Sequence, residues 1–115
     1  MSTADVLNHH LQAFSAGDAE EAAKDYDDRS VLITQNGQAV GQAAIKEAMT
    51  ELFSGPFKPG TYEFAVDETE IAGDVAFIAW HADTASHEIP LGTDTYVVRD
   101  GKIAVQTFAA QMNPK

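Results

Sequence analysis

The hydrophobic period of this chain changes at Pro59-Gly60, and this change restricts the fold more than any other feature. Before it, apolar residues recur at helical spacing from Val6 to Phe14 and again from Gln42 to Ser54. After it, apolar and polar residues alternate, as along Tyr62–Asp67, which is typical of a strand with one buried face. The order predicts helices first and a meander of antiparallel strands second. We therefore expect an α+β fold with helices packed on one face of a curved sheet.

Capping residues and turn residues divide this layout into elements. Ser2–Asp5 can cap the first helix, which Gly17 ends, and Asp18 with Glu21 resembles a second capping box. The β-branched run Val31–Thr34 predicts a short strand.

In the second half, Gly73-Asp74 predicts a hairpin turn from which a strand runs back over Val75–Ala85. His87–Pro90 is expected to reverse the chain again. Asp100-Gly101 favours the positive φ angles of a tight hairpin between the last two strands.

Composition excludes several classes of function. The 115 residues suffice for one domain (1–115) with its own core, and the lack of cysteine excludes disulfides and zinc-thiolate sites. Seven basic and eighteen acidic residues give a net charge of −11, which repels nucleic acids and anionic membranes. The longest apolar run, Val75–Trp80, is too short to span a bilayer, and Met1–Thr3 does not begin a signal-peptide pattern. We expect a cytoplasmic protein.

Asp94 is the residue from which a functional argument can start. Side chains alternate along a strand, so Asp94, Tyr96 and Val98 share one face, and the apolar members of this set predict that it faces inward. Burial would raise the pKa of the Asp94 carboxyl and suit it for acid–base chemistry. The alternative is a strand aspartate that bonds a neighbouring backbone group or Arg99.

Four motifs occur in an order that resembles a known family: Ala16–Asp18, Tyr26–Leu32, Gly41–Ile45 and Asp94–Ile103. Together they are similar to the SnoaL-like and ketosteroid-isomerase-like branch of the nuclear transport factor 2-like superfamily. The resemblance implies a cone-shaped barrel, in which a curved antiparallel sheet wraps around N-terminal helices and leaves an apolar pocket at its open end. It also implies a homodimer through the outer face of the sheet.

The resemblance implies two catalytic residues. Asp94 matches the strand position that supplies a carboxylic acid to the pocket of ketosteroid isomerases. His10 lies seven residues before Gly17, where those enzymes place the tyrosine that holds the substrate oxyanion. The alternative for His10 is a half-buried helix residue bonded to water. His9 and His10 point about 100° apart on a helix and cannot share one metal ion.

The catalytic base of the isomerases has no counterpart. An ungapped count from Tyr26 places it at Thr34, or at Ile33 after a slip of one residue, and neither side chain is a base near pH 7. Asp27 and Asp28 come too early and are expected to be solvated or to cap a turn. This departure counts against steroid isomerisation by the usual mechanism.

The strand around Trp80 leaves two orientations open. If Ile78, Trp80 and Ala82 face inward, Trp80 forms a wall for a flat apolar ligand. If Phe77, Ala79 and His81 face inward, Trp80 belongs to the dimer face. With the first orientation, we expect the substrate-binding residues to be Phe14, Tyr26, Met49, Phe53, Ile78, Trp80, Tyr96, Gln106 and Phe108.

Two hypotheses of function follow. The first is a cofactor-free, metal-free isomerase or cyclase that acts on a small apolar or polycyclic molecule with Asp94 and His10. The second is a non-catalytic dimeric module that binds a ligand or another protein. The missing base at Thr34 favours the second hypothesis, whereas the polar groups expected inside the cone favour the first.

Overall fold

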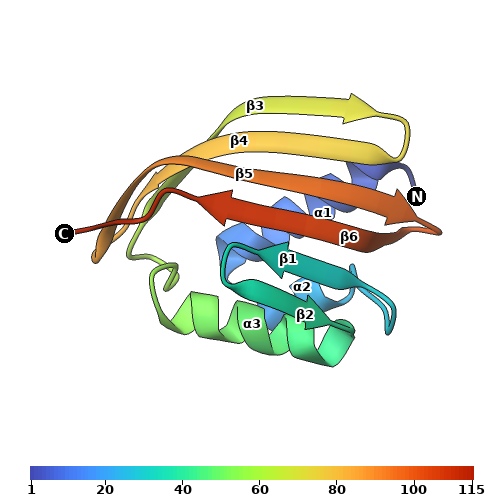
Figure 1. The fold of residues 1–115 in the computed structure, drawn as a ribbon, viewed down its shortest axis with the longest axis horizontal. Helices are drawn as coiled ribbons and strands as arrows, with labels where there is room; N and C mark the ends of the chain where they lie inside the picture. Colours follow the sequence, from blue (N-terminus) through green and yellow to red (C-terminus); the bar gives the residue numbers. More distant parts are fainter.

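The computed structural model describes residues 1–115 and confirms the α+β architecture, with N-terminal helices against a curved, open sheet (Figure 1). None of its helices is both long enough and apolar enough to cross a membrane. The elements, in chain order, are α1 (Thr3–Ala16), α2 (Ala19–Ala23), β1 (Val31–Thr34), β2 (Gly37–Val40), α3 (Gln42–Ser54), β3 (Glu63–Ala72), β4 (Val75–Asp83), β5 (His87–Arg99), β6 (Lys102–Ala110) and β7 (Asn113–Pro114).

The first helix begins and ends where its capping residues predict. The Ser2 hydroxyl accepts from the Asp5 amide and the Asp5 carboxylate accepts from the Ser2 amide, both at 3.1 Å. Gly17 closes α1 in the left-handed region with φ 64°. Asp18 then accepts from the Glu21 amide at 3.0 Å and starts α2. These ends turn α2 back against α1, which brings residues after α2 close to the His9 and His10 side chains.

The sheet has the strand order β2-β1-β6-β5-β4-β3, and α1 passes behind it in Figure 1. Strands β3 to β6 form the predicted antiparallel meander, while β1 lies parallel to β6. The sequence did not predict β2, which pairs with β1 after a tight turn. Asp100 and Gly101 have the positive φ angles expected of them, 52° and 75°.

The expected reversal at His87–Pro90 is wrong, because these residues belong to β5. The chain turns instead at residues 84–86. Thr84 is buried, and its hydroxyl accepts from the amides of Ser86 at 3.2 Å and His87 at 2.9 Å. Pro90 is tolerated within a strand because the pairing with β4 is irregular there.

Alternation along β4 selects one of the two orientations left open. Ile78, Trp80 and Ala82 are buried on the inner face, whereas Phe77 and Ala79 are only partly covered and His81 is exposed. Trp80 packs in an aromatic cluster whose neighbouring ring centroids lie 5.1 to 6.3 Å apart. The other members of the cluster are Phe14, Phe53, Phe57, Tyr62, Phe64 and Phe108.

Candidate functional site

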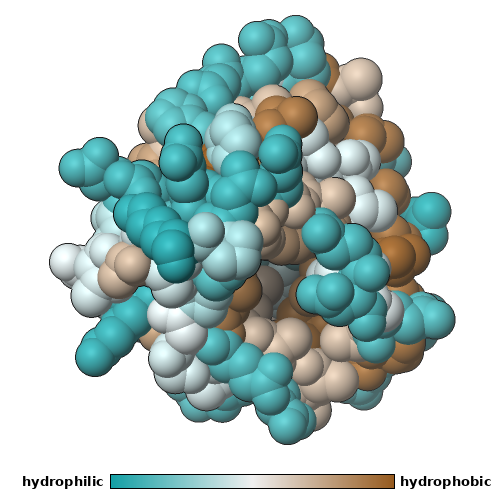
Figure 2. All heavy atoms as spheres, turned by 60° about the vertical axis from the view of Figure 1, so that its left-hand side comes forward, coloured by the Kyte–Doolittle hydropathy of each residue, from teal (hydrophilic) through white to brown (hydrophobic).

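A small cavity of about 40 Å³ lies between α1, α3 and the inner face of the sheet. The end of the molecule that Figure 2 brings forward has a narrow hollow with apolar atoms at its base and polar groups around it. The volume has room for about three water molecules and is far below the ~300 Å³ of a typical small-molecule pocket. The lining consists of His10, Leu11, Phe14, Met49, Leu52, Phe64, Ile78, Trp80, Asp94, Tyr96, Gln106 and Phe108.

Most of the residues expected at a binding site line this cavity, but Tyr26 and Phe53 do not. The Tyr26 hydroxyl donates to Gln106 Oε1 behind the lining, and Phe53 packs against Phe14 in the core. Three further residues of the lining were not predicted from the sequence: Leu11, Leu52 and Phe64. Leu11 and Leu52 lie on helical stripes and Phe64 in an alternating strand, so the same periodicity marks them as core residues without indicating a cavity.

Asp94 is the one carboxyl group in the lining, and it is 5 % exposed. Trp80 Nε1 donates to its Oδ1 at 2.8 Å. Gln106 Nε2 and the Tyr96 hydroxyl donate to Oδ2 at 2.8 and 3.4 Å. The alternative pairing with Arg99 is wrong, because Arg99 is exposed. The bond from Tyr26 to the Gln106 carbonyl fixes the amide so that its NH₂ group faces Asp94.

Burial raises the pKa of Asp94 above its ordinary 3.8, and hydrogen bonds from Trp80 and Gln106, together with the nearby His10, offset part of this rise. Burial also raises the pKa of Tyr26 and of Tyr96 well above 10. Both phenols therefore stay protonated at neutral pH and serve as hydrogen-bond donors. Asp94 is thus a proton carrier surrounded by neutral donors.

The raised pKa makes Asp94 a source of pH-dependent instability. Between the unfolded pKa of 3.8 and the higher folded value, the folded state binds the extra proton, so stability falls as pH rises through this range. Asp94→Asn should remove this decrease in the free energy of unfolding. The decrease amounts to about 1.4 kcal/mol for each pH unit between the unfolded and the folded pKa of Asp94. Urea unfolding of both proteins from pH 3 to 8 measures it. A stability difference that does not change with pH would contradict the raised pKa.

His10 is 3 % exposed and lies edge-on to two tyrosine rings, at centroid distances of 5.8 Å from Tyr26 and 5.4 Å from Tyr96. The alternative of a half-buried histidine bonded to water is therefore wrong. His10 also lines the cavity. Its Nδ1 atom faces the buried carboxylate of Asp25, a residue that the sequence analysis did not identify.

Thr34 and the acidic pair take no part in the cavity. The Thr34 hydroxyl accepts from the Asn36 amide at 3.1 Å and donates to the Gly37 carbonyl at 3.2 Å, so it closes the β1–β2 turn. Asp27 and Asp28 are exposed. No cluster of three or more histidine or acidic side chains is arranged to hold a metal ion.

Comparisons with known proteins agree with this architecture. A family model described as "SnoaL-like domain" matches residues 7–106. A candidate polyketide cyclase from Sinorhizobium meliloti superposes with a TM-score of 0.76 at 18% identity, covering 90% of this chain and 93% of that one. A candidate ketosteroid isomerase from Kribbella flavida gives 0.78 at 15%, covering 95% and 77%. An NTF2-like protein from Mesorhizobium loti gives 0.80 at 19%, covering 95% and 90%. No curated protein matches the sequence.

Proposed function

The chain belongs to the SnoaL-like domain family, and from this premise we propose that it catalyses proton transfer next to the carbonyl group of a small apolar substrate without a cofactor. The observation that carries the proposal is the Asp94 carboxyl, buried in a mostly apolar cavity and held by Trp80 and Gln106. A carboxyl in such surroundings has a pKa closer to the operating pH than a solvated one, which makes it a more effective base.

The proposed step uses Asp94 and His10 as an acid–base pair. The Asp94 carboxylate removes a proton from the carbon next to the carbonyl, and the C–H electron pair forms the carbon–carbon double bond of an enolate. His10, as the imidazolium, donates a hydrogen bond or its proton to the enolate oxygen. Asp94 then returns its proton to the same carbon, which restores the substrate, or to a conjugated carbon, which isomerises it. His10 takes back any proton it gave to the oxygen, so both side chains are regenerated.

The cavity favours a small substrate over a polycyclic one. Its volume of about 40 Å³ must grow several-fold before even a single ring fits. Leu11 and Leu52, on α1 and α3, line the cavity and are only partly buried, so we place the enlargement at these side chains. Some structural neighbours are named as candidate cyclases or isomerases, which fits chemistry at an enolate. Thr34 occupies the position at which the isomerases would carry their carboxylate base, and its side chain closes the β1–β2 turn outside the cavity. The proposal therefore uses no second carboxylate base.

Deuterium exchange tests the proposal without knowledge of the natural substrate. The protein is incubated in D₂O with a panel of small cyclic ketones and enones, and loss of the α-proton signals is followed by NMR. We expect exchange with at least one compound to exceed the buffer rate and to saturate with substrate concentration. Saturable chemical-shift changes at cavity residues, with exchange at the buffer rate for every compound, would instead identify a non-catalytic binding module.

We also propose a homodimer through the outer face of the sheet, which faces the viewer in Figure 1. One row of paired positions crossing five strands contains only valines, and the next row is also free of charge from β1 to β4. This uncharged surface on a chain of net charge −11 suits a second copy of itself. The rows are Val40, Val31, Val105, Val97 and Val75, followed by Ile33, Thr107, Thr95 and Phe77.

Val105→Glu should convert the dimer to a monomer, because it buries an unpaired charge near the middle of the proposed interface. Sedimentation velocity at micromolar concentration measures the change. Thr50→Glu, on an exposed position of α3, should leave the dimer intact. A wild-type protein that sediments as a monomer at these concentrations would contradict the dimer proposal.

A further inference from the structure

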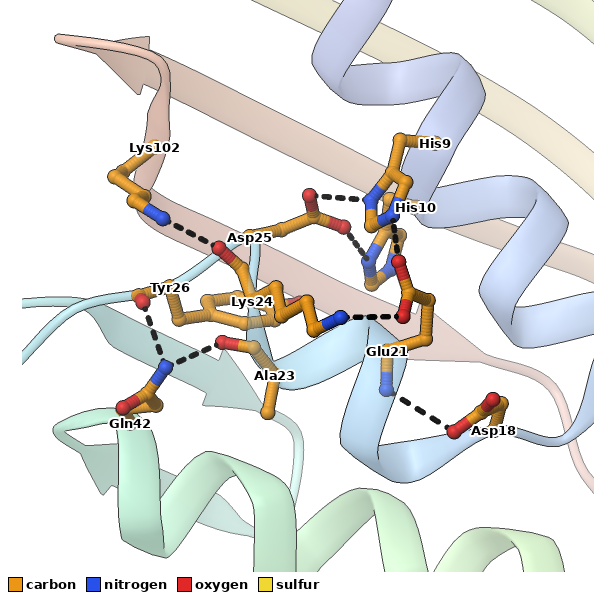
Figure 3. A network of polar contacts seen from close by, with 10 residues as sticks. All are labelled: His9, His10, Asp18, Glu21, Ala23, Lys24, Asp25, Tyr26, Gln42 and Lys102. Carbon is orange, nitrogen blue, oxygen red and sulfur yellow. Dashed lines mark hydrogen bonds and ion pairs between the residues drawn. The ribbon is translucent and has the colours of Figure 1, made fainter.

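On the side away from the cavity, His10 has a second acidic neighbour, Asp25 (Figure 3). Asp25 follows α2 directly and is 4 % exposed. Its carboxylate lies between the two consecutive histidines of α1. Oδ1 is 2.6 Å from His9 Nδ1, and Oδ2 is 3.6 Å from His10 Nδ1. The two histidines, which cannot share a metal ion, thus share one carboxylate.

The two atoms that face each other across the longer gap have no other partner. His10 Nδ1 and Asp25 Oδ2 are both buried and make no hydrogen bond. A buried donor and a buried acceptor are both destabilising when left unpaired. At 3.6 Å they lie just beyond hydrogen-bond distance, and a shift of ~0.5 Å would satisfy both with one N–H···O bond. Such contacts in ligand-free sites often tighten when the substrate binds.

Asp25 is held firmly enough to impose this geometry. Its backbone carbonyl accepts from the Ile103 amide at 2.7 Å, and its own amide donates to the Ala22 carbonyl at 3.1 Å. On the outer side, His9 bridges Asp25 to Glu21, whose Oε1 lies 2.8 Å from His9 Nε2. The hydrogen bond with Glu21, and after it that with Asp25, raises the pKa of His9, which favours the form in which Nδ1 donates to Oδ1. Oδ2 is then left for His10.

We propose that Asp25 is a positioning residue, which accepts the Nδ1 proton of His10 and thereby makes Nε2 the nitrogen that exchanges its proton in the cavity. This inference rests on the proposed function for its catalytic meaning. The charged or titratable groups around His10 are Asp94 and Tyr96 from β5, Tyr26 after α2, and His9 through the shared carboxylate. Asp25 is the further neighbour, and its oxygen is the one that lies against Nδ1.

The geometry matters because a neutral imidazole carries one proton, on either nitrogen. If Nδ1 holds it, Nε2 is a base after it has protonated an enolate oxygen, and it can take the same proton back. If Nε2 holds it, Nε2 cannot accept a proton from the substrate, and the basic nitrogen is Nδ1, which faces Asp25. A carboxylate behind the ring selects the first arrangement and stabilises the imidazolium that forms.

The tautomer of neutral His10 can be measured without any substrate. Two-bond ¹H–¹⁵N correlation spectra of the ¹⁵N-labelled protein, taken at a pH where His10 is neutral, should show the proton on Nδ1. In Asp25→Leu, which keeps the number and branching of the side-chain heavy atoms but removes the acceptor, the main tautomer should change to Nε2–H. Asp28→Leu, which removes an exposed carboxylate three residues further along the chain, should leave it unchanged. A wild-type His10 with its proton on Nε2, or a tautomer unaffected by Asp25→Leu, would overturn the proposal.

Asp25→Asn separates the acceptor from the charge. Its amide oxygen can still accept from His10 Nδ1 when its NH₂ group donates to the unprotonated Nδ1 of a neutral His9, whose Nε2–H stays with Glu21, so this variant should retain the Nδ1–H tautomer of His10. With an active ketone, Asp25→Leu should lower kcat about 10- to 100-fold with KM little changed, the range for residues that orient a functional histidine. If the wild type has Nδ1–H and Asp25→Leu loses it, the positioning role is supported even when no ketone exchanges its α-protons. If the protein catalyses α-proton exchange while His10 is the Nε2–H tautomer, the positioning role is overturned and the proposed function is not.

Discussion

Asp94→Asn is expected to lower protein-catalysed exchange of α-protons by about 10²- to 10⁴-fold, the usual contribution of a general acid–base residue. Asparagine has nearly the same shape as aspartate, and its carbonyl oxygen can still accept from Trp80 Nε1. It has no basic oxygen that can accept a proton from carbon. The loss should therefore appear in kcat, with substrate binding affected much less.

The matched control for this prediction is Glu88→Gln. Glu88 lies on β5 as Asp94 does, but its side chain is exposed. The substitution removes the same charge from the same strand and should leave exchange at the wild-type rate. If Asp94→Asn catalyses α-proton exchange at a rate within a few-fold of the wild-type rate, Asp94 is not the catalytic base. This conclusion holds whatever reaction the protein catalyses.

The inward orientation of Asp94 could be predicted because a strand alternates and its neighbours Tyr96 and Val98 are apolar. Alternation also showed which residues of β4 share a face. It could not show which of the two faces points inward, since the face with Trp80 and the face with Phe77 are both mainly apolar. The structure resolves this through the aromatic cluster. Periodicity therefore predicts which residues share a face, and packing determines which face is buried.

The Asp25 contacts could not be predicted from local pattern. Asp25 and His9 are 16 residues apart and meet only because Gly17 and Asp18 turn α2 back onto α1. Phe57 follows the helix break at Gly55-Pro56, where no period marks it, yet it is fully buried. The cavity volume depends on how the rings around Trp80 interlock. These features arise from tertiary packing, which periodicity alone does not describe.

The close contact between Gly92 and Trp80 leads to the largest stability effect that we expect. A Cβ atom on Gly92 would lie 2.2 Å from both Cε2 and Cζ2 of the Trp80 indole. Trp80 is 1 % exposed, it packs against Phe57, Phe64 and Phe108, and its Nε1 donates to Asp94, so the ring cannot move aside without breaking these contacts. Gly92→Ala should therefore destabilise the fold by about 3 kcal/mol, the upper end of the range for an overpacked core.

Unfolding of Gly92→Ala in urea, followed by circular dichroism, measures this loss. Trp80 is the single tryptophan, so its fluorescence should also report displacement of the indole from Asp94. The matched test is a double-mutant cycle with Trp80→Leu, a side chain too short to reach residue 92. If the clash is the cause, Gly92→Ala should destabilise the Trp80→Leu protein much less than the wild type. Equal losses in both backgrounds would show that residue 92 must be glycine for a reason other than the indole.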